Sequence, residues 1–194
     1  MRKFLCALAL CLVFTGNAPA SESNLPDWQN PGIVERNREP MTAFFQTDGL
    51  RVNLNGQWKF CWYESIDSRS KDFFNPSYDD SAWDEMPVPG MWELNGYGDP
   101  VYKNIGYAWH GHYKDNPPYP AMEHNYAGQY RKTFTIDGQW KGKDVYLYIG
   151  SATSNVRVWI NGKEVGYSED SKLEARFNIT RYVKQGENHV ALEI

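Results

Sequence analysis

The sequence predicts an all-β protein built as a sandwich of short strands, and three observations support this. Apolar and polar residues alternate over short segments, which is the period of a half-buried strand. Turn-forming Asn, Asp, Gly and Pro separate these segments at short spacing. No helical pattern reaches four turns. At 194 residues the chain has the size of one domain and can bury a core without disulfide or metal support.

The first half of the chain is expected to contain few strands. Residues 21–50 are polar, contain three prolines and show no periodicity, so they predict an extended lead-in. Residues 57–63 alternate and predict a strand. Residues 65–82 predict a loop with a short helical turn near residues 78–81. The run Pro87-Val88-Pro89-Gly90 has the composition of a turn.

The second half predicts strands in quick succession. The expected strands are residues 130–136, 145–149, 156–160, 164–167, 175–179 and 190–194. Asn161-Gly162 lies between two of them and predicts a two-residue hairpin turn. Many short strands joined by turns are typical of a β-sandwich.

Residues 1–20 have the pattern of an export signal. Arg2 and Lys3 precede an apolar run, residues 4–14, that is too short to span a bilayer. Ala18-Pro19-Ala20 then supplies the small residues of a cleavage site. We therefore expect export to the periplasm or outside the cell, with no membrane span; a lipoprotein or an ordinary buried helix is the weaker alternative.

Cysteine usage leaves no intrachain disulfide in the expected mature chain. Cys6 and Cys11 belong to the signal segment, so only Cys61 remains. Cys61 lies in an apolar strand pattern, which predicts a buried and inert thiol.

Composition and motifs exclude several kinds of chemistry. The net charge is −4 and no basic cluster occurs, which argues against a nucleic-acid partner. The acid pairs Asp79-Asp80, Asp84-Glu85 and Glu169-Asp170 are sequence neighbours, so they do not face each other as glycosidase carboxylates must. His110-Gly111-His112 lacks a third ligand, so we expect no bound metal or other cofactor in this chain.

Aromatic residues make up 15% of the chain and crowd between residues 92 and 129. They are Trp92, Tyr97, Tyr102, Tyr107, Trp109, Tyr113, Tyr119 and Tyr126. Two interpretations stand equal: a platform on which sugar rings stack, or a loop packed on a neighbouring domain. Asn104 lies between two of these tyrosines, and its amide can both donate to and accept from a hydroxyl.

Several motifs, weak singly but specific in their order, resemble the N-terminal sugar-binding domain of family-two glycoside hydrolases, specifically bacterial β-galactosidases. They are Trp28-Gln29-Asn30-Pro31-Gly32, Leu54-Asn55-Gly56-Gln57-Trp58, Asp79-Asp80-Ser81-Ala82-Trp83, Val88-Pro89-Gly90-Met91-Trp92, Pro100-Val101-Tyr102-Lys103-Asn104, Trp159-Ile160-Asn161-Gly162-Lys163 and Gly186-Glu187-Asn188. The resemblance covers about residue 28 to the end. The family usually has Pro after the tyrosine that matches Tyr107, where this chain has Ala108.

This resemblance implies a jelly-roll β-sandwich over residues 51–194, incomplete at its C-terminal end, after a signal peptide (1–20) and a lead-in (21–50). It implies a downstream TIM barrel as partner, which carries the catalytic glutamates and commonly Mg²⁺ and Na⁺. In this chain it implies one substrate-binding residue, Asn104. The alternation breaks off at Ile194, which we interpret as the mark of a fragment.

Two classes of function follow from these observations. The first is the sugar-binding part of an exported β-galactosidase that hydrolyses terminal β-galactosides with retention, inactive without its barrel. Its partners would be a β-galactoside or oligosaccharide and, in the full enzyme, further copies of itself. The second is a stand-alone secreted carbohydrate-binding module. A fragment of a β-glucuronidase or β-mannosidase would share the fold, but residues 28–38 favour a galactosidase.

Overall fold

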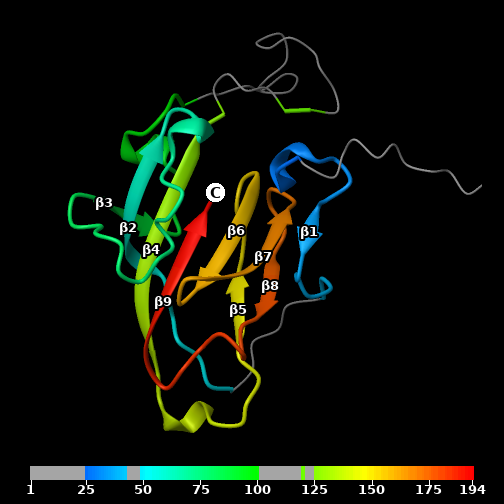
Figure 1. Cartoon of the computed structure of the whole chain (residues 1–194), viewed down its shortest axis with the longest axis vertical. Helices are drawn as coiled ribbons and strands as arrows, with labels where there is room; N and C mark the ends of the chain where they lie inside the picture. The colour runs from blue at the N-terminus through cyan, green and yellow to red at the C-terminus, as the bar shows by residue number, and fades with distance from the viewer. Residues whose placement is uncertain (1–24, 43–48, 101–118, 121–124) are drawn as a thin grey trace, which may run out of the picture.

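The computed structural model describes residues 25–42, 49–100, 119–120 and 125–194 (Figure 1). Nine strands occur in this part of the chain: β1 (Glu35–Arg36), β2 (Gly56–Tyr63), β3 (Asp84–Val88), β4 (Ala127–Ile136), β5 (Tyr146–Ile149), β6 (Asn155–Ile160), β7 (Lys163–Glu169), β8 (Ala175–Asn178) and β9 (Gly186–Glu193). Four single-turn 3₁₀ helices accompany them: Asp27–Gln29, Ile66–Ser68, Glu93–Asn95 and Gly138–Trp140. None of the helices in these ranges is long and apolar enough to cross a membrane.

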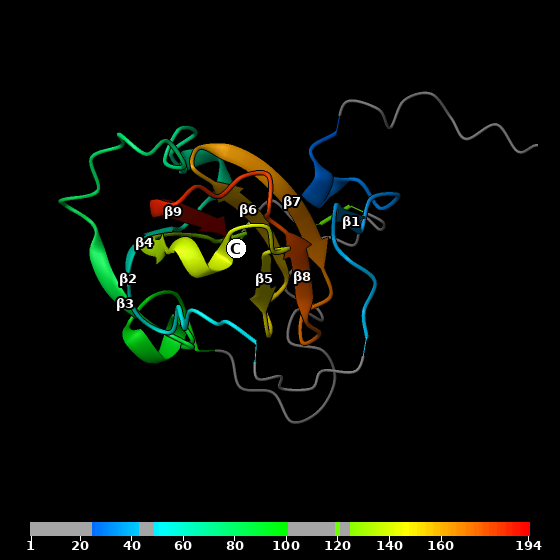
Figure 2. The same ribbon diagram turned by 90° about the horizontal axis from the view of Figure 1, so that it is seen from below.

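Two antiparallel sheets face each other. The larger sheet has seven strands in the order β1-β7-β6-β9-β4-β2-β3, and the smaller one pairs β5 with β8. Seen from below, the larger sheet curves around the smaller pair (Figure 2). The predicted all-β sandwich is therefore confirmed.

The main core fills the space between the two sheets. Alternate residues of each strand point inward, as the alternating sequence pattern requires. Phe60 of β2, Val158 of β6 and Phe177 of β8 are fully buried there, and Leu147 of β5 joins them in the same apolar cluster. Burial of this cluster is the main force that holds the sheets together.

The outer face of the larger sheet is also covered by a loop. The polar residues on this face had indicated exposure to solvent instead. The loop after β2 folds back over the sheet and buries Phe73 against Trp159 of β6, with ring centroids 5.2 Å apart. Arg131 on β4 reaches into this loop and binds the carbonyl oxygens of Phe73 and Asn75. A polar residue at an outward-facing strand position here anchors a loop instead of meeting water.

Most strands of the second half lie where they were predicted. In the hairpin between β6 and β7, Asn161 and Gly162 have φ angles of 51° and 80°. Both angles are positive, as a type I′ turn requires, and Asn-Gly tolerates them best. The hairpin prediction is confirmed.

Three local predictions were wrong. Residues 84–88 form strand β3, although Pro87 predicted a turn; β3 is an edge strand, so the missing N–H of proline leaves no ladder bond unmade. Strand β4 begins at Ala127 rather than Tyr130, because Gly128 hides the alternation. Cys61 is half-buried rather than buried, because it lies on the outer side of β2.

The lead-in has more structure than its composition indicated. Its strand β1 pairs with β7 at the edge of the larger sheet, with Arg36 opposite Tyr167. Two residues later, Arg38 forms a bridge with Phe177 of β8. The lead-in therefore crosses from one sheet to the other and closes this side of the sandwich.

Gly166 on β7 permits this crossing. A methyl group added at Gly166 would lie 2.3 Å from the carbonyl oxygen of Arg36 and 2.8 Å from the Phe177 ring. We expect Gly166→Ala to lower the free energy of unfolding by about 2 kcal/mol, because neither backbone nor buried ring can give way. Urea unfolding followed by circular dichroism measures this. Gly150→Ala, with nothing nearer than 3.7 Å, is the control, and an equal effect in both variants would refute the argument.

Candidate functional site

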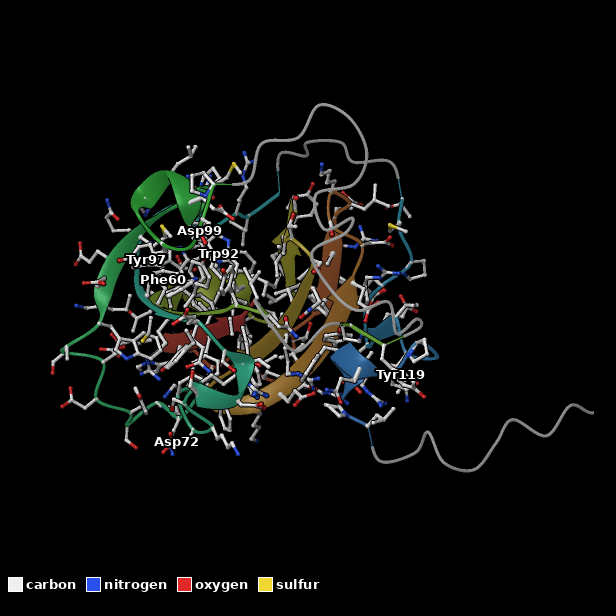
Figure 3. All side chains as sticks on the ribbon, turned by 90° about the horizontal axis from the view of Figure 1, so that it is seen from above. Phe60, Asp72, Trp92, Tyr97, Asp99 and Tyr119 are labelled. Atoms are coloured by element: carbon white, nitrogen blue, oxygen red, sulfur yellow. The ribbon has the colours of Figure 1, made fainter. Side chains whose placement is uncertain are left out.

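Part of the aromatic segment packs inward at one end of the larger sheet. The rings of Trp92 and Tyr97 meet the buried Phe60 edge-on, with centroids 6.4 and 4.9 Å away (Figure 3). The 3₁₀ helix Glu93–Asn95 between them ends at Gly96, whose φ of 94° turns the chain back toward the sheet. These two rings therefore stabilise this domain's own core, and packing on a neighbouring domain stays a prediction for the rest of the aromatic segment.

A second aromatic pair extends this end of the sheet. Trp62 on β2 packs against Tyr126, which directly precedes β4, with centroids 5.1 Å apart. Gly98 brings the backbone close to both rings, 3.6 Å from Trp62 and 3.7 Å from Tyr126 for an added methyl group. Tyr119 lies elsewhere, on the side of the lead-in, and is 42% exposed (Figure 3). The described aromatic residues therefore do not form one continuous platform.

Tyr97 links this aromatic cluster to the edge strand. Its hydroxyl donates a hydrogen bond of 2.8 Å to Asp84 Oδ2 on β3. Burial, together with this bond to a carboxylate, raises the pKa of Tyr97 to about 12. The phenol therefore stays protonated near neutral pH and acts as a hydrogen-bond donor.

Strand β9 ends beside the same cluster. The backbone N–H and C=O of Ile194 both pair with Gly128, next to Tyr126. One residue earlier, Glu193 accepts hydrogen bonds from Arg69 at 3.0 Å and from the buried Gln129 at 2.8 Å. The end of β9 thus pairs with Gly128, which lies against Trp92 of the segment before Asn104.

Some of the predicted site residues lie outside the part of the chain that the structure describes, and the acid pairs lie within it. Asn104 and the histidines His110 and His112 lie outside the described residues, as does the signal segment, residues 1–20. No group of His, Cys, Asp or Glu that could hold a metal ion occurs within the described ranges.

Members of the acid pairs make hydrogen bonds or ion pairs that stabilise the fold. Asp79 accepts from the backbone N–H of Ser81, and Asp80 pairs with Arg131 at 2.6 Å. Glu169 accepts from the Tyr167 hydroxyl. These contacts agree with their interpretation as turn caps and structural acids rather than as a catalytic pair.

One charged cluster escaped the sequence analysis. Asp27 is buried in the lead-in and binds Arg36 at 3.0 Å and Arg157 of β6 at 2.8 Å. Arg157 also binds Glu164 of β7 at 2.9 Å. Burial alone would raise the pKa of the Asp27 carboxyl, but the bonds from Arg36 and Arg157 outweigh it and hold this pKa below its usual value. The only sequence signal was an acid beside the Trp28 motif.

This cluster makes the free energy of unfolding depend on pH in the acidic range. Because the pKa of Asp27 is lowered in the folded protein, its contribution to the free energy of unfolding is complete above about pH 4. That contribution is lost as the pH falls through the pKa that Asp27 has in the folded protein. We expect Asp27→Asn to cost about 2 kcal/mol of unfolding free energy at pH 7, through weakened charge-assisted bonds. The gap to the wild type should shrink below about pH 4, as urea titrations at several pH values would show. A gap that stays constant down to the lowest pH would contradict this, and Glu187→Gln, on an exposed side chain, is the control.

Comparison with known proteins agrees with this architecture. The family model described as "Glycosyl hydrolases family 2, sugar binding domain" matches residues 51–194. The chain is 39% identical to a β-galactosidase of Priestia megaterium over 93% of its length, and 36% identical to one of Vibrio cholerae over 84%. It spans only 19% and 16% of those relatives, respectively.

Solved structures show the same fold. A β-glucuronidase from an uncultured Clostridium species has a TM-score of 0.58 at 20% identity, and covers 79% of this chain and 24% of its own. A β-glycosidase from Bacteroides vulgatus has a TM-score of 0.54 at 29% identity, covering 75% of this chain and 17% of its own. The model match over most of the chain, the galactosidase relatives and the shared sandwich together place this chain in glycosyl hydrolase family 2, as a protein that contains the family's sugar-binding domain.

Proposed function

We propose that this chain is the substrate-binding N-terminal part of an exported β-galactosidase. The observation that carries the proposal is the identity of 36–39% to curated β-galactosidases over most of the chain. Residues 1–20 support export, because they combine a basic start, a short apolar run and an A-x-A site.

The proposed role is to bind the galactoside and to complete a catalytic domain that follows. The retaining carboxylate pair, and the Mg²⁺ and Na⁺ of the family, belong to that downstream barrel. This chain contributes Asn104, whose amide can hold one sugar hydroxyl as both donor and acceptor. The cluster of Phe60, Trp92 and Tyr97 supports this role, because it anchors the segment just before Asn104 to the sheet.

A β-glucuronidase is the second candidate, since several solved structures of similar fold carry that name. Those structures are 20% and 24% identical to this chain, so they support the shared fold alone. The curated galactosidases are more similar in sequence and favour a β-galactoside. A stand-alone binding module is less well supported, because the relatives are several times longer than this chain.

Asn104→Ala tests the proposal in a full-length enzyme that begins with this chain. We expect kcat/KM for a chromogenic β-galactoside to fall by the equivalent of about 1–3 kcal/mol, because a substrate hydroxyl loses its partner. Asn95→Ala is the matched control, since Asn95 is exposed and its side-chain amide donates to the carbonyl of Met91. Unchanged kinetics in Asn104→Ala would refute the role of Asn104, and faster turnover of a β-glucuronide than of the galactoside would refute the substrate.

A further inference from the structure

We propose that a second pocket, on the outer face of the larger sheet, binds one neutral sugar ring. The pocket lies between the lead-in, the loop after β2 and strands β6, β7 and β9. Its volume is about 340 Å³, at the lower end of the range of small-molecule sites. In Figure 3 the loop that carries Asp72 and the lead-in flank this face on either side.

One wall of the pocket is aromatic. Phe74 and Trp159 stack in parallel, with an interplanar angle of 5° and centroids 5.2 Å apart. Phe73 meets Trp159 edge-on behind them. Trp28 lines the pocket from the lead-in, half-buried, and its indole N–H meets no hydrogen-bond acceptor among the described residues. Phe73 and Trp159 are buried, so the half-buried rings of Phe74 and Trp28 are the ones whose flat faces can meet the C–H face of a pyranose.

The facing wall carries charged groups in equal numbers of each sign. They are the cations Arg69, Lys71 and Arg157 and the carboxylates Asp27, Glu164 and Glu193. Arg157 lies between Asp27 and Glu164, at 2.8 and 2.9 Å. Arg69 and Glu193 form a further pair at 3.0 Å. This wall therefore offers fixed donors and acceptors with no excess charge.

These features select among classes of ligand. A phosphate or carboxylate ligand would need an excess of cations, and here each arginine already holds a carboxylate. A purely apolar ligand would leave the ion pairs desolvated without compensation. A neutral sugar meets both walls, because its hydroxyls can share the remaining lone pairs of the carboxylates while its ring covers the aromatic wall. This pocket has none of the residues of the proposed galactoside site, so its occupancy does not rest on Asn104.

Indole N–H signals test the proposal in the 194-residue chain. Methyl β-galactoside and methyl β-glucoside would be titrated separately, in concentrations that saturate a millimolar site, while ¹⁵N–¹H spectra are recorded. We expect the signals of Trp28 and Trp159 to shift and that of Trp140, on a distant 3₁₀ helix, to stay in place. No shift at Trp28 and Trp159 with either sugar would overturn the proposal, as would tighter binding of glucuronate than of the neutral glucoside.

Two variants locate the binding and a third separates it from the proposed galactoside site. Phe74→Leu removes one aromatic face and should weaken binding about fivefold, whereas Tyr146→Leu removes an exposed ring outside the pocket and should leave it unchanged. Glu164→Gln, which keeps an oxygen for Arg157, should also weaken binding. Asn104→Ala should leave the titration as in the wild type. Loss of the shifts in Asn104→Ala, or their full retention in Phe74→Leu, would refute the second pocket.

Discussion

We expect Arg131→Met to lower the free energy of unfolding by about 4 kcal/mol. The substitution removes the side chain that anchors a covering loop, and it leaves the hydrogen-bond partners of the guanidinium unpaired. The Arg131 side chain binds the carboxylate of Asp80 at 2.6 Å and the carbonyls of Phe73 and Asn75. Its guanidinium also lies 5.4 Å from the ring centre of Tyr78. Methionine has a similar length but offers no donor to any of these groups.

The loss should appear first in the loop rather than in the main core. Release of the loop exposes Phe73 and Trp159, so tryptophan fluorescence should shift to longer wavelength. Trypsin should then cleave faster after Lys71 or Arg69 in the same loop. Urea unfolding followed by circular dichroism measures the total change in free energy.

Two further variants distinguish anchoring from general damage to β4. Arg131→Lys keeps the charge but cannot supply a planar fork of donors, so we expect an intermediate loss. Lys132→Met changes the next residue, whose ammonium donates exposed hydrogen bonds to the carbonyls of Gln57 at 2.8 Å and Asn55 at 3.5 Å and contacts no part of the loop that Arg131 anchors among the described residues. A loss in Lys132→Met as large as in Arg131→Met would show that the anchor is not the cause.

Asn188→Ala should lower the free energy of unfolding by about 3 kcal/mol, the second largest effect, because one buried side chain makes four hydrogen bonds at once. Asn188 is 0% exposed. Its amide nitrogen donates to the carbonyls of Lys184 and Gly186, and its oxygen accepts from the Lys184 N–H and from Asn161. Urea titration at 25 °C measures this change in the free energy of unfolding.

Asn188→Asp separates hydrogen bonding from shape. The aspartate has the same outline but points an oxygen at two carbonyl oxygens, so we expect a loss at least as large as with alanine. Asn178→Ala, which gives up one exposed bond to the Thr180 N–H, serves as the matched control. If Asn188→Asp were as stable as the wild type, the four bonds could not be the source of the effect.

The sequence predicted those strands whose signal is local. Val156, Val158 and Ile160 alternate along β6, and the following Asn161-Gly162 needs no distant partner to favour a tight turn. The main core followed from the same alternation. Asn104 came from an ordered set of motifs, and its role stays a prediction, because it lies outside the described residues.

What the sequence could not predict depends on contacts distant in the chain. Arg131 has the polarity of an exposed strand residue, and nothing near it indicates that a loop more than fifty residues earlier would cover it. Asp27 likewise became identifiable as buried only once Arg157 was placed beside it, 130 residues later. The pocket of the further inference is built from such contacts, which is why periodicity did not indicate it.

The strand order has a consequence for the assembly of the sheet. Strand β9 comes last among the described strands, yet it lies between β4 and β6 and is the only strand that joins them. The half-sheet β4-β2-β3 and the half-sheet β1-β7-β6 therefore have no common ladder until residues 186–193 are in place. Up to that moment each half presents an unpaired edge, and such edges readily recruit strands from another molecule. The chain is thus most prone to aggregate just before its central strand arrives.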